Sequence, residues 1–452
     1  MISRTRRILL VNPWIIDFAA YDFWIKPLGL LRIGSLLREW GIAVDLLDCL
    51  DRRHPALDAW QGCQPADHPD GSGKFIRQIA QKPACLQDVP RHYSRYGLPV
   101  EIVEKLLAEI EPPDAIFLTS MMTYWYPAVA EMAQLLRRFF PTSPIVLGGV
   151  YATLLPEHAC QQVQPDLLVK GEAEPQLPAI VGRLFGSNVQ PAPEFAALPF
   201  PAYDLYPQLD SIAIETSRGC PYSCSFCASH LLVQKFRQRH PESVVEELTH
   251  WVQNAGIRHA AFYDDALLVH REQSIKPILR RIINDRLPVH LHLPNGIQPR
   301  QIDRELADLL FAARADTIRL SFESSRPERQ ADISGKVTPH DLEAALHLLQ
   351  KAGYQRDKLG VYVLFGLPEQ SPEEVRESCL LVHELGARIC AASFSPIPGT
   401  RSWSLAVAKQ EWEDHRDPLL SNSSLFPLWR SLYGYEFCQE LLLWIKTLNQ
   451  SI

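Results

Sequence analysis

The 452-residue chain contains no long uncharged hydrophobic run. One uncharged stretch, residues 115–130, includes two threonines, a serine and a proline, and it is shorter than the ~20 residues of a membrane span. At the N-terminus, three arginines precede only four apolar residues, 8–11, whereas the apolar core of a signal peptide needs roughly 7–15. The sequence therefore predicts a first β-strand at this position, and neither an export signal nor a transmembrane segment.

The chain also lacks an excess of basic residues and has few cysteines. Its 45 basic and 52 acidic residues give a net charge of -7, which argues against a nucleic-acid partner because such proteins usually carry clustered positive charge. Ten cysteines are too few for a disulfide-stabilised scaffold of this length. We therefore expect a cytoplasmic protein in a reducing compartment.

The N-terminal region, residues 1–190, alternates short apolar segments with helical patterns. This alternation is typical of an α/β fold with a doubly wound, Rossmann-like parallel sheet, which binds ligands at the carboxyl ends of its strands. Residues 51–99 interrupt the alternation and are predicted to form an insertion, and a proline-rich linker is predicted over residues 191–207. The predicted strands are residues 8–12, 43–47, 115–120, 144–147 and 167–170.

The alternation of strands and helices starts again after this linker. Six consecutive strand–helix units predict a partial (β/α)6 TIM-type barrel over residues 208–400, with its chemistry at the carboxyl ends of the strands. Residues 401–452 are predicted to form a helical C-terminal extension. The predicted barrel strands are residues 212–216, 260–263, 289–293, 317–322, 360–365 and 391–394.

Three cysteines lie together directly after the first predicted barrel strand. Cys220, Cys224 and Cys227 have spacings of four and three residues, so their thiolates can surround one small inorganic centre. A structural zinc site normally has four protein ligands, and His230 is the local candidate for the fourth. Cysteine thiolates are also the ligands of 4Fe-4S clusters, and a cluster held by only three leaves one iron open. The spacing favours the cluster over zinc, or over thiols without a ligand.

The segment from Glu215 to Cys227 resembles the signature of the radical S-adenosylmethionine (SAM) superfamily, CxxxCxΦC, with Phe226 as the aromatic residue. The resemblance implies that the open iron binds the amine and carboxylate of SAM. An electron from the cluster would then cleave the sulfonium and give a 5′-deoxyadenosyl radical. Such chemistry requires a low-potential cluster in a site that excludes water. It also implies a low-potential electron donor such as flavodoxin or ferredoxin.

The same resemblance implies contacts to SAM at the ends of the later barrel strands. One of these segments, residues 362–369, resembles the GxIxGxxE motif of the family, although Tyr362 replaces its first glycine. The alternative for each position is a structural role, such as a carboxylate that caps a helix or a glycine in a turn. The predicted SAM-binding residues are Phe226, Asp264, Asp265, Asn295, Glu323, Gly366 and Pro398.

The N-terminal region resembles the cobalamin-binding domain that precedes the radical SAM domain in one large subgroup. Small residues at its strand ends would allow a corrinoid to approach the backbone. The Asp-x-His-x-x-Gly motif is absent, so the resemblance implies cobalamin bound without a histidine ligand; the alternative is a sheet kept only as a scaffold. The predicted cobalamin contacts are Asn12, Ser120, Met122, Gly148, Gly149, Gly171 and Glu172.

Taken together, these resemblances imply a cobalamin-dependent radical SAM enzyme that methylates an unactivated carbon of a small-molecule or lipid-like substrate. Radical cyclisation, oxidation or rearrangement without methyl transfer is an alternative. A corrinoid or redox sensor is an alternative of another class. The polar residues at the ends of the barrel strands favour an enzyme, because a sensor has no need of a SAM pocket.

Overall fold

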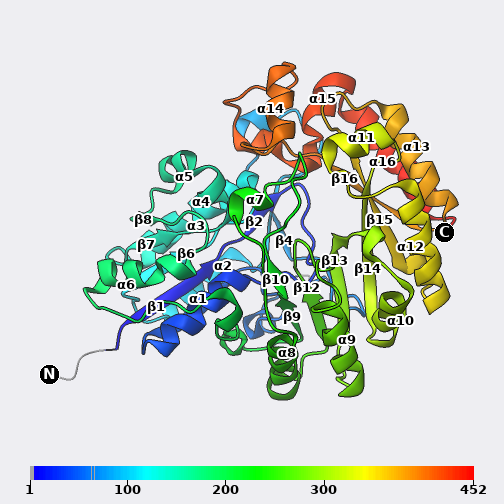
Figure 1. The fold of residues 1–452 in the computed structure, drawn as a ribbon. Helices are drawn as coiled ribbons and strands as arrows, with labels where there is room; N and C mark the ends of the chain where they lie inside the picture. Colours follow the sequence, from blue (N-terminus) through cyan, green and yellow to red (C-terminus); the bar gives the residue numbers. More distant parts are fainter. Residues whose placement is uncertain (1–4, 63, 66) are drawn as a thin grey trace. The chain divides into compact units, whose positions relative to one another are not determined.

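The computed structural model describes residues 5–62, 64–65 and 67–452. Residues 1–4 of the predicted N-terminal domain, and residues 63 and 66 of the predicted insertion, lie outside the described residues. The chain divides into two compact units, residues 1–212 and 213–452 (Figure 1). Among the described residues, no helix combines the length and the apolar character needed to cross a membrane.

The first unit is built on a five-stranded parallel sheet with the strand order β3-β1-β6-β7-β8. Residues 8–11 are completely buried in the interior strand β1, as expected for a parallel sheet covered on both faces. All five predicted strands are present, and the predicted Rossmann-like architecture is confirmed. The strands are β1 (Arg7–Asn12), β3 (Ala43–Asp48), β6 (Ala115–Leu118), β7 (Ile145–Leu147) and β8 (Leu167–Leu168).

The helices that connect these strands bury their apolar faces against the sheet. Leu10 of β1, Leu36 of the first helix and Val181 of the last belong to one hydrophobic core. The helices are α1 (Leu28–Glu39), α2 (Val100–Glu109), α3 (Tyr126–Phe139), α4 (Val150–Leu154), α5 (Pro156–Val163) and α6 (Leu177–Phe185).

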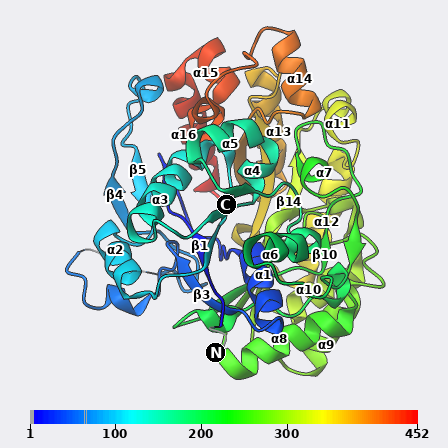
Figure 2. The same ribbon diagram turned by 90° about the vertical axis from the view of Figure 1, so that its left-hand side faces the viewer.

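The insertion contributes strands to a small sheet of its own. Its strands β4 (Arg77–Ile79) and β5 (Ser94–Tyr96), which are labelled next to each other in Figure 2, pair with each other in antiparallel fashion. With β2 (Ile15–Asp17) they form an antiparallel sheet in the order β2-β5-β4. The sequence does not predict this sheet, because three-residue strands are too short for their alternation of apolar and polar residues to be recognised.

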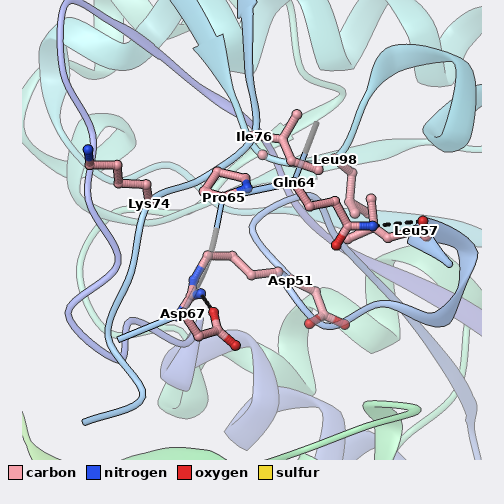
Figure 3. A pocket seen from close by; sticks show the side chains of 10 residues that line it. Asp51, Leu57, Gln64, Pro65, Asp67, Lys74, Ile76 and Leu98 are labelled. Carbon is pink, nitrogen blue, oxygen red and sulfur yellow. Dashed lines mark hydrogen bonds and ion pairs between the residues drawn. The ribbon is translucent and has the colours of Figure 1, made fainter. Parts of the chain in front are cut away.

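The insertion also contains a pocket of about 90 Å³. Figure 3 shows this pocket, where the Gln64 side chain donates a hydrogen bond to the Leu57 carbonyl.

The second unit contains a six-stranded sheet with the order β16-β15-β14-β13-β12-β9, in which the strands follow one another in chain order. Strands β12 to β16 pair in parallel, and within the described residues the sheet ends at β9 and β16. This is the predicted partial barrel. Its strands are β9 (Ser211–Ile214), β12 (His259–Phe262), β13 (His290–Ile297), β14 (Ala315–Glu323), β15 (Leu359–Phe365) and β16 (Arg388–Ser393).

The barrel strands separate an apolar outer face from a polar inner face. On β14, Ile318, Leu320 and Phe322 are completely buried, whereas the alternating residues Arg319 and Ser321 are only half-buried. Helices form the outer layer along the strands (Figure 1). These helices are α8 (Pro241–Ala255), α9 (Ile275–Asn284), α10 (Arg304–Ala312), α12 (Pro339–Ala352) and α13 (Pro372–Glu384).

Shorter elements complete the second unit. The C-terminal helix protects the edge strand β16, because the Asn449 amide bonds both the N–H and the carbonyl of Ile389, at 2.8 and 2.9 Å. The predicted helical extension is therefore attached to the barrel. The elements are β10 (Ser217–Arg218), β11 (Arg237–Gln238), α7 (Ser229–Leu232), α11 (Pro327–Ile333), α14 (Arg401–Ala408), α15 (Pro427–Tyr433) and α16 (Tyr435–Asn449).

Candidate active site

The three clustered cysteines lie on the loop between β10 and α7. Gly219 lies directly before the three cysteines and has a φ of 82°, a backbone conformation that residues with a side chain rarely adopt. Ser225 in the loop attaches it on two sides: its N–H donates to the Ile333 carbonyl at 2.8 Å, and its carbonyl accepts from Ser402 N–H at 2.9 Å. Contacts from distant parts of the barrel therefore fix the backbone of this loop.

Asp264 anchors the segment that leads into the cysteine loop. Its Oδ1 atom accepts hydrogen bonds from the backbone N–H and the hydroxyl of Thr216, at 3.0 and 2.7 Å. The same atom accepts from the N–H and the hydroxyl of Ser217, both at 2.6 Å. Burial raises the pKa of Asp264 to about 6, although these donors favour the ionised carboxylate. Asp264, predicted to contact SAM, faces this segment and is not among the residues that line the cavity described next.

A cavity of about 290 Å³ opens beside the cysteine loop. Four of the seven predicted SAM-binding residues line it, and Asp264, Gly366 and Pro398 do not. Gly366 faces another region, since a Cβ atom there would lie 3.8 Å from the Trp429 ring. The residues that line the cavity are Cys220, Tyr222, Cys224, Phe226, Cys227, Ser229, Asp265, Pro294, Asn295, Gly296, Ser321, Phe322, Glu323, Gln330, Ser334, Lys336, Val337 and Tyr362.

Two of the predicted SAM-binding residues in this cavity have distinctive local structure. Two hydrogen bonds orient the Asn295 side chain: its amide donates to the backbone carbonyls of Tyr263 and Asp264, both at 3.2 Å. Glu323 ends β14 with a φ of 71°, a strained conformation of the kind that is often found at functional sites. Burial raises the pKa of Glu323 to about 7, and the nearby charge of Lys336 opposes this rise. A carboxyl group with such a pKa can accept or release a proton near neutral pH.

Lys336 is a cavity residue that sequence reasoning missed. Its ammonium lies 4.6 Å from the centroid of the Tyr222 ring, and its positive charge opposes the rise in the pKa of the nearby Cys224 thiol. Burial lowers the pKa of Lys336, but the thiols and Glu323 outweigh this effect, so the pKa is raised. Lys336 lies more than a hundred residues after the cysteines, outside any motif, so only the fold brings it to them.

Tyr362 closes one side of the same cavity. Its hydroxyl donates to the Pro294 carbonyl at 2.8 Å, and a Cβ atom at Gly296 would lie 3.2 Å from the Tyr362 ring. The tyrosine that replaces the first glycine of the family motif therefore packs against β13 and occupies space that a glycine would leave empty.

The donor set of the cavity fits an iron–sulfur cluster. All three thiols line one cavity, and thiolates are the ligands that such clusters use. Burial raises the pKa of Cys220 and Cys224, and Lys336 partly offsets this rise. No three or more His, Cys, Asp or Glu side chains within the described ranges converge as the ligands of a single metal ion do. In a cluster the thiolates bind different iron atoms, so they need not converge on one point.

In the first unit, three of the predicted cobalamin contacts pack against one another at the ends of β6 and β7. The Ser120 hydroxyl donates to the Gly148 carbonyl at 2.7 Å. Gly149 has a φ of 96°, and a Cβ atom there would lie 2.2 Å from the Ser120 carbonyl oxygen. A side chain at Gly149 is therefore excluded both by conformation and by space.

The other predicted cobalamin contacts lie at the carboxyl ends of neighbouring strands or on the loops that follow them. Asn12 ends β1, and its amide donates to the Asp48 carboxylate at 2.7 Å. Met122 is 43% exposed on the loop after β6. The N–H of Gly171 donates to the Thr153 hydroxyl at 2.9 Å, and Glu172 follows it. Because β1, β6, β7 and β8 are parallel, these residues occupy one edge of the sheet.

Comparison with known proteins identifies the second unit. Residues 214–382 match the family model of the radical SAM superfamily. These residues are a radical SAM domain. The cysteine loop and the four cavity-lining residues predicted to contact SAM lie inside this domain, so the resemblance inferred from the cysteine spacing is confirmed.

The relatives of this chain include proteins named as methyltransferases and cyclases. An uncharacterized methyltransferase of Pyrococcus horikoshii is 26% identical over 337 residues, which cover 68% of this chain and 72% of that protein. An anaerobic magnesium-protoporphyrin IX monomethyl ester cyclase of Rubrivivax gelatinosus is 21% identical over 300 residues. That match covers 59% of this chain and 53% of the cyclase, so the chain spans about half the length of the latter protein.

A solved structure reproduces the fold of both units. The radical SAM methyltransferase TsrM from Kitasatospora setae, with cobalamin and a [4Fe-4S] cluster bound, aligns with a TM-score of 0.65. The alignment covers 90% of this chain and 78% of TsrM at 20% sequence identity. The likeness supports the predicted combination of a Rossmann-like unit and a radical SAM barrel.

Proposed function

We propose that this protein is a cobalamin-dependent radical SAM enzyme that methylates an unactivated carbon of a small molecule. The observation that carries the proposal is the convergence of three thiols, Asn295 and Glu323 on one 290 Å³ cavity inside a radical SAM domain. Such a cavity can hold an iron–sulfur cluster and a cofactor next to each other. The names of the relatives and of TsrM support methyl transfer as the reaction.

The residues of the cavity divide into two groups in this proposal. Cys220, Cys224 and Cys227 hold a 4Fe-4S cluster, which when bound supplies the electron that cleaves SAM. Asp265 and Glu323 have carboxylates that accept hydrogen bonds from the SAM amine or ribose. The remaining walls exclude water, which matters because a carbon radical reacts with whatever lies beside it.

Cobalamin binding is assigned to the carboxyl edge of the N-terminal sheet. Gly148 lies at this edge, and a Cβ atom there would meet only Val169, at 3.9 Å, so a large planar corrinoid can approach the backbone at this point. Asn12, Met122, Gly171 and Glu172 surround the same edge. When bound, cobalamin supplies a transferable methyl group, and no histidine of this chain is assigned as its ligand.

The proposal includes a low-potential electron donor, such as flavodoxin or ferredoxin, and the reducing cytoplasm as the compartment. A second candidate function is radical cyclisation or oxidation without methyl transfer. It is favoured by the cyclase relatives. The two functions differ in the fate of SAM, because only methyl transfer produces S-adenosylhomocysteine.

The test is anaerobic reconstitution of the full chain with iron, sulfide and hydroxocobalamin, followed by incubation with SAM and a reductant. We expect an iron–sulfur absorption band, bound cobalamin, release of 5′-deoxyadenosine and formation of S-adenosylhomocysteine. Cys224→Ala should abolish the cluster and SAM cleavage, whereas Cys160→Ala, at an exposed cysteine far from the cavity in sequence, should change neither.

Three results would overturn parts of the proposal. SAM cleavage by the Cys224→Ala variant would refute the assignment of the cluster. Release of 5′-deoxyadenosine without S-adenosylhomocysteine would favour the cyclase-like function. Binding of cobalamin and a cluster without any SAM cleavage would favour the sensor.

A further inference from the structure

Two arginines occupy one row of the inner face of the barrel. In the strand register, Arg319 of β14 lies beside Gly360 of β15, and Gly360 lies beside Arg388 of β16. Residues in one row of a parallel sheet point to the same face. The next row on this face contains Ser321 and Tyr362, which line the cavity. The arginine row is therefore two residues, about 7 Å, further from the barrel mouth.

Gly360 allows the Arg319 side chain to extend across β15. A Cβ atom at Gly360 would lie 2.7 Å from both Cδ and Nη1 of Arg319, and 2.9 Å from Sγ of Cys390. Burial raises the pKa of the Cys390 thiol, and the charges of Arg319 and Arg388 both lower it. Both guanidinium groups therefore act on the same small region between β15 and β16.

Neither guanidinium has a carboxylate partner among the described residues. Arg319 donates one hydrogen bond, from Nη1 to the Ile318 carbonyl at 3.3 Å, and Arg388 is exposed. Other arginines of this unit do have such partners, for example Arg329 with Glu374 at 3.0 Å. Guanidinium groups bind carboxylates and phosphates through paired hydrogen bonds. Two of them without carboxylates on one row constitute a site suited to an oxyanion.

We propose that Arg319 and Arg388 bind a carboxylate or phosphate group of the substrate. The substrate is then an acid whose anionic group lies on the arginine row, next to the row of Ser321 and Tyr362 that lines the cavity. The identity of this ligand as the substrate rests on the proposed function. The binding of an oxyanion at this site does not, so the two fail separately.

The test measures anion binding by the full chain without SAM or reductant. Phosphate is titrated and followed by ³¹P NMR, and ¹³C-labelled acetate is titrated and followed by ¹³C NMR, which distinguishes the two anion classes. We expect saturable binding of at least one anion. Arg319→Gln and Arg388→Gln should each weaken it about tenfold, or about 1.4 kcal/mol of binding free energy, because each variant loses a charged hydrogen-bond donor.

Arg300→Gln serves as the matched control, because Arg300 is an exposed arginine of the same unit that lies between β13 and α10, outside the arginine row. This variant should bind anions like the wild type. Gly360→Ala adds a second test, because the methyl group displaces Arg319 without removing its charge, and it should also weaken binding. Equal anion binding in all variants, or no saturable binding of either anion, would overturn the proposal.

Discussion

Replacement of Asp264 is the sharpest test of how this barrel supports its cysteine loop. The single oxygen Oδ1 accepts four hydrogen bonds, two from backbone N–H groups and two from hydroxyls, all from Thr216 and Ser217. Asp264→Ala removes this acceptor from a buried site. Asp264→Asn keeps an acceptor oxygen of nearly the same shape and removes only the charge, so the pair separates geometry from electrostatics.

The expected loss of stability in Asp264→Ala follows from the hydrogen-bond donors of Thr216 and Ser217 that remain without an acceptor. The two hydroxyls can rotate to other acceptors, but the two buried N–H groups cannot, and each costs roughly 1–3 kcal/mol when left unpaired. Asp264→Ala should therefore destabilise the second unit by about 4 kcal/mol, near the upper end of single substitutions. For a unit of 240 residues this corresponds to a fall in Tm of roughly 10 °C. Asp264→Asn should cost about 1 kcal/mol, because burial already disfavours the charged form.

The assay is thermal unfolding of the cofactor-free chain at pH 8, followed by circular dichroism, together with iron content after anaerobic reconstitution. Asp264→Ala should melt earlier and retain less iron, and Asp264→Asn should resemble the wild type in both measurements. If Asp264→Ala melts within 2 °C of the wild type, a shift worth about 1 kcal/mol or less, the carboxylate does not anchor the loop and the reasoning is wrong.

Three further predictions concern the cavity and the edge strand. The pKa of Glu323 rises from 4.5 to about 7 on folding. Its contribution to the free energy of unfolding is therefore fully present below pH 4.5 and is lost as the pH rises through 7. The Tm of Glu323→Gln should therefore fall less than that of the wild type between pH 5 and 8, and parallel Tm curves would contradict this. Lys336→Met should lower the reduction potential of the reconstituted cluster, because a positive charge beside Cys224 favours the reduced state, and Lys336→Arg should restore most of it in a redox titration. An unchanged potential in Lys336→Met would show that Lys336 does not act on the cluster. Asn449→Ala should destabilise the second unit by about 1–2 kcal/mol through two lost hydrogen bonds to Ile389, and faster amide exchange at Ile389 would localise the effect; exchange at the wild-type rate would contradict it.

Much of the fold was predictable from the chain itself because its strands are locally encoded. Residues 8–11 form a continuous apolar run that only a strand covered on both faces accommodates, and similar runs recur between helical patterns along the chain. The short strands of the insertion were not predictable, because a three-residue strand exists only through its pairing partners. The cysteine motif was equally local, since Cys220, Cys224 and Cys227 lie within one loop.

Only the tertiary structure decided which of the remaining polar residues support the fold and which lie at the cavity or on the arginine row. Asp264 and Asp265 are neighbours in the loop that follows β12, yet one carboxylate anchors the segment before the cysteines and the other lines the cavity. Lys336 reaches the cysteines only through the fold. Arg319 and Arg388 are separated by almost seventy residues, and strand register alone places them in one row. The sequence by itself determined the chemistry of the cysteine loop, because that chemistry is encoded by local spacing. The surrounding charges depend on contacts distant in sequence, which no local pattern records.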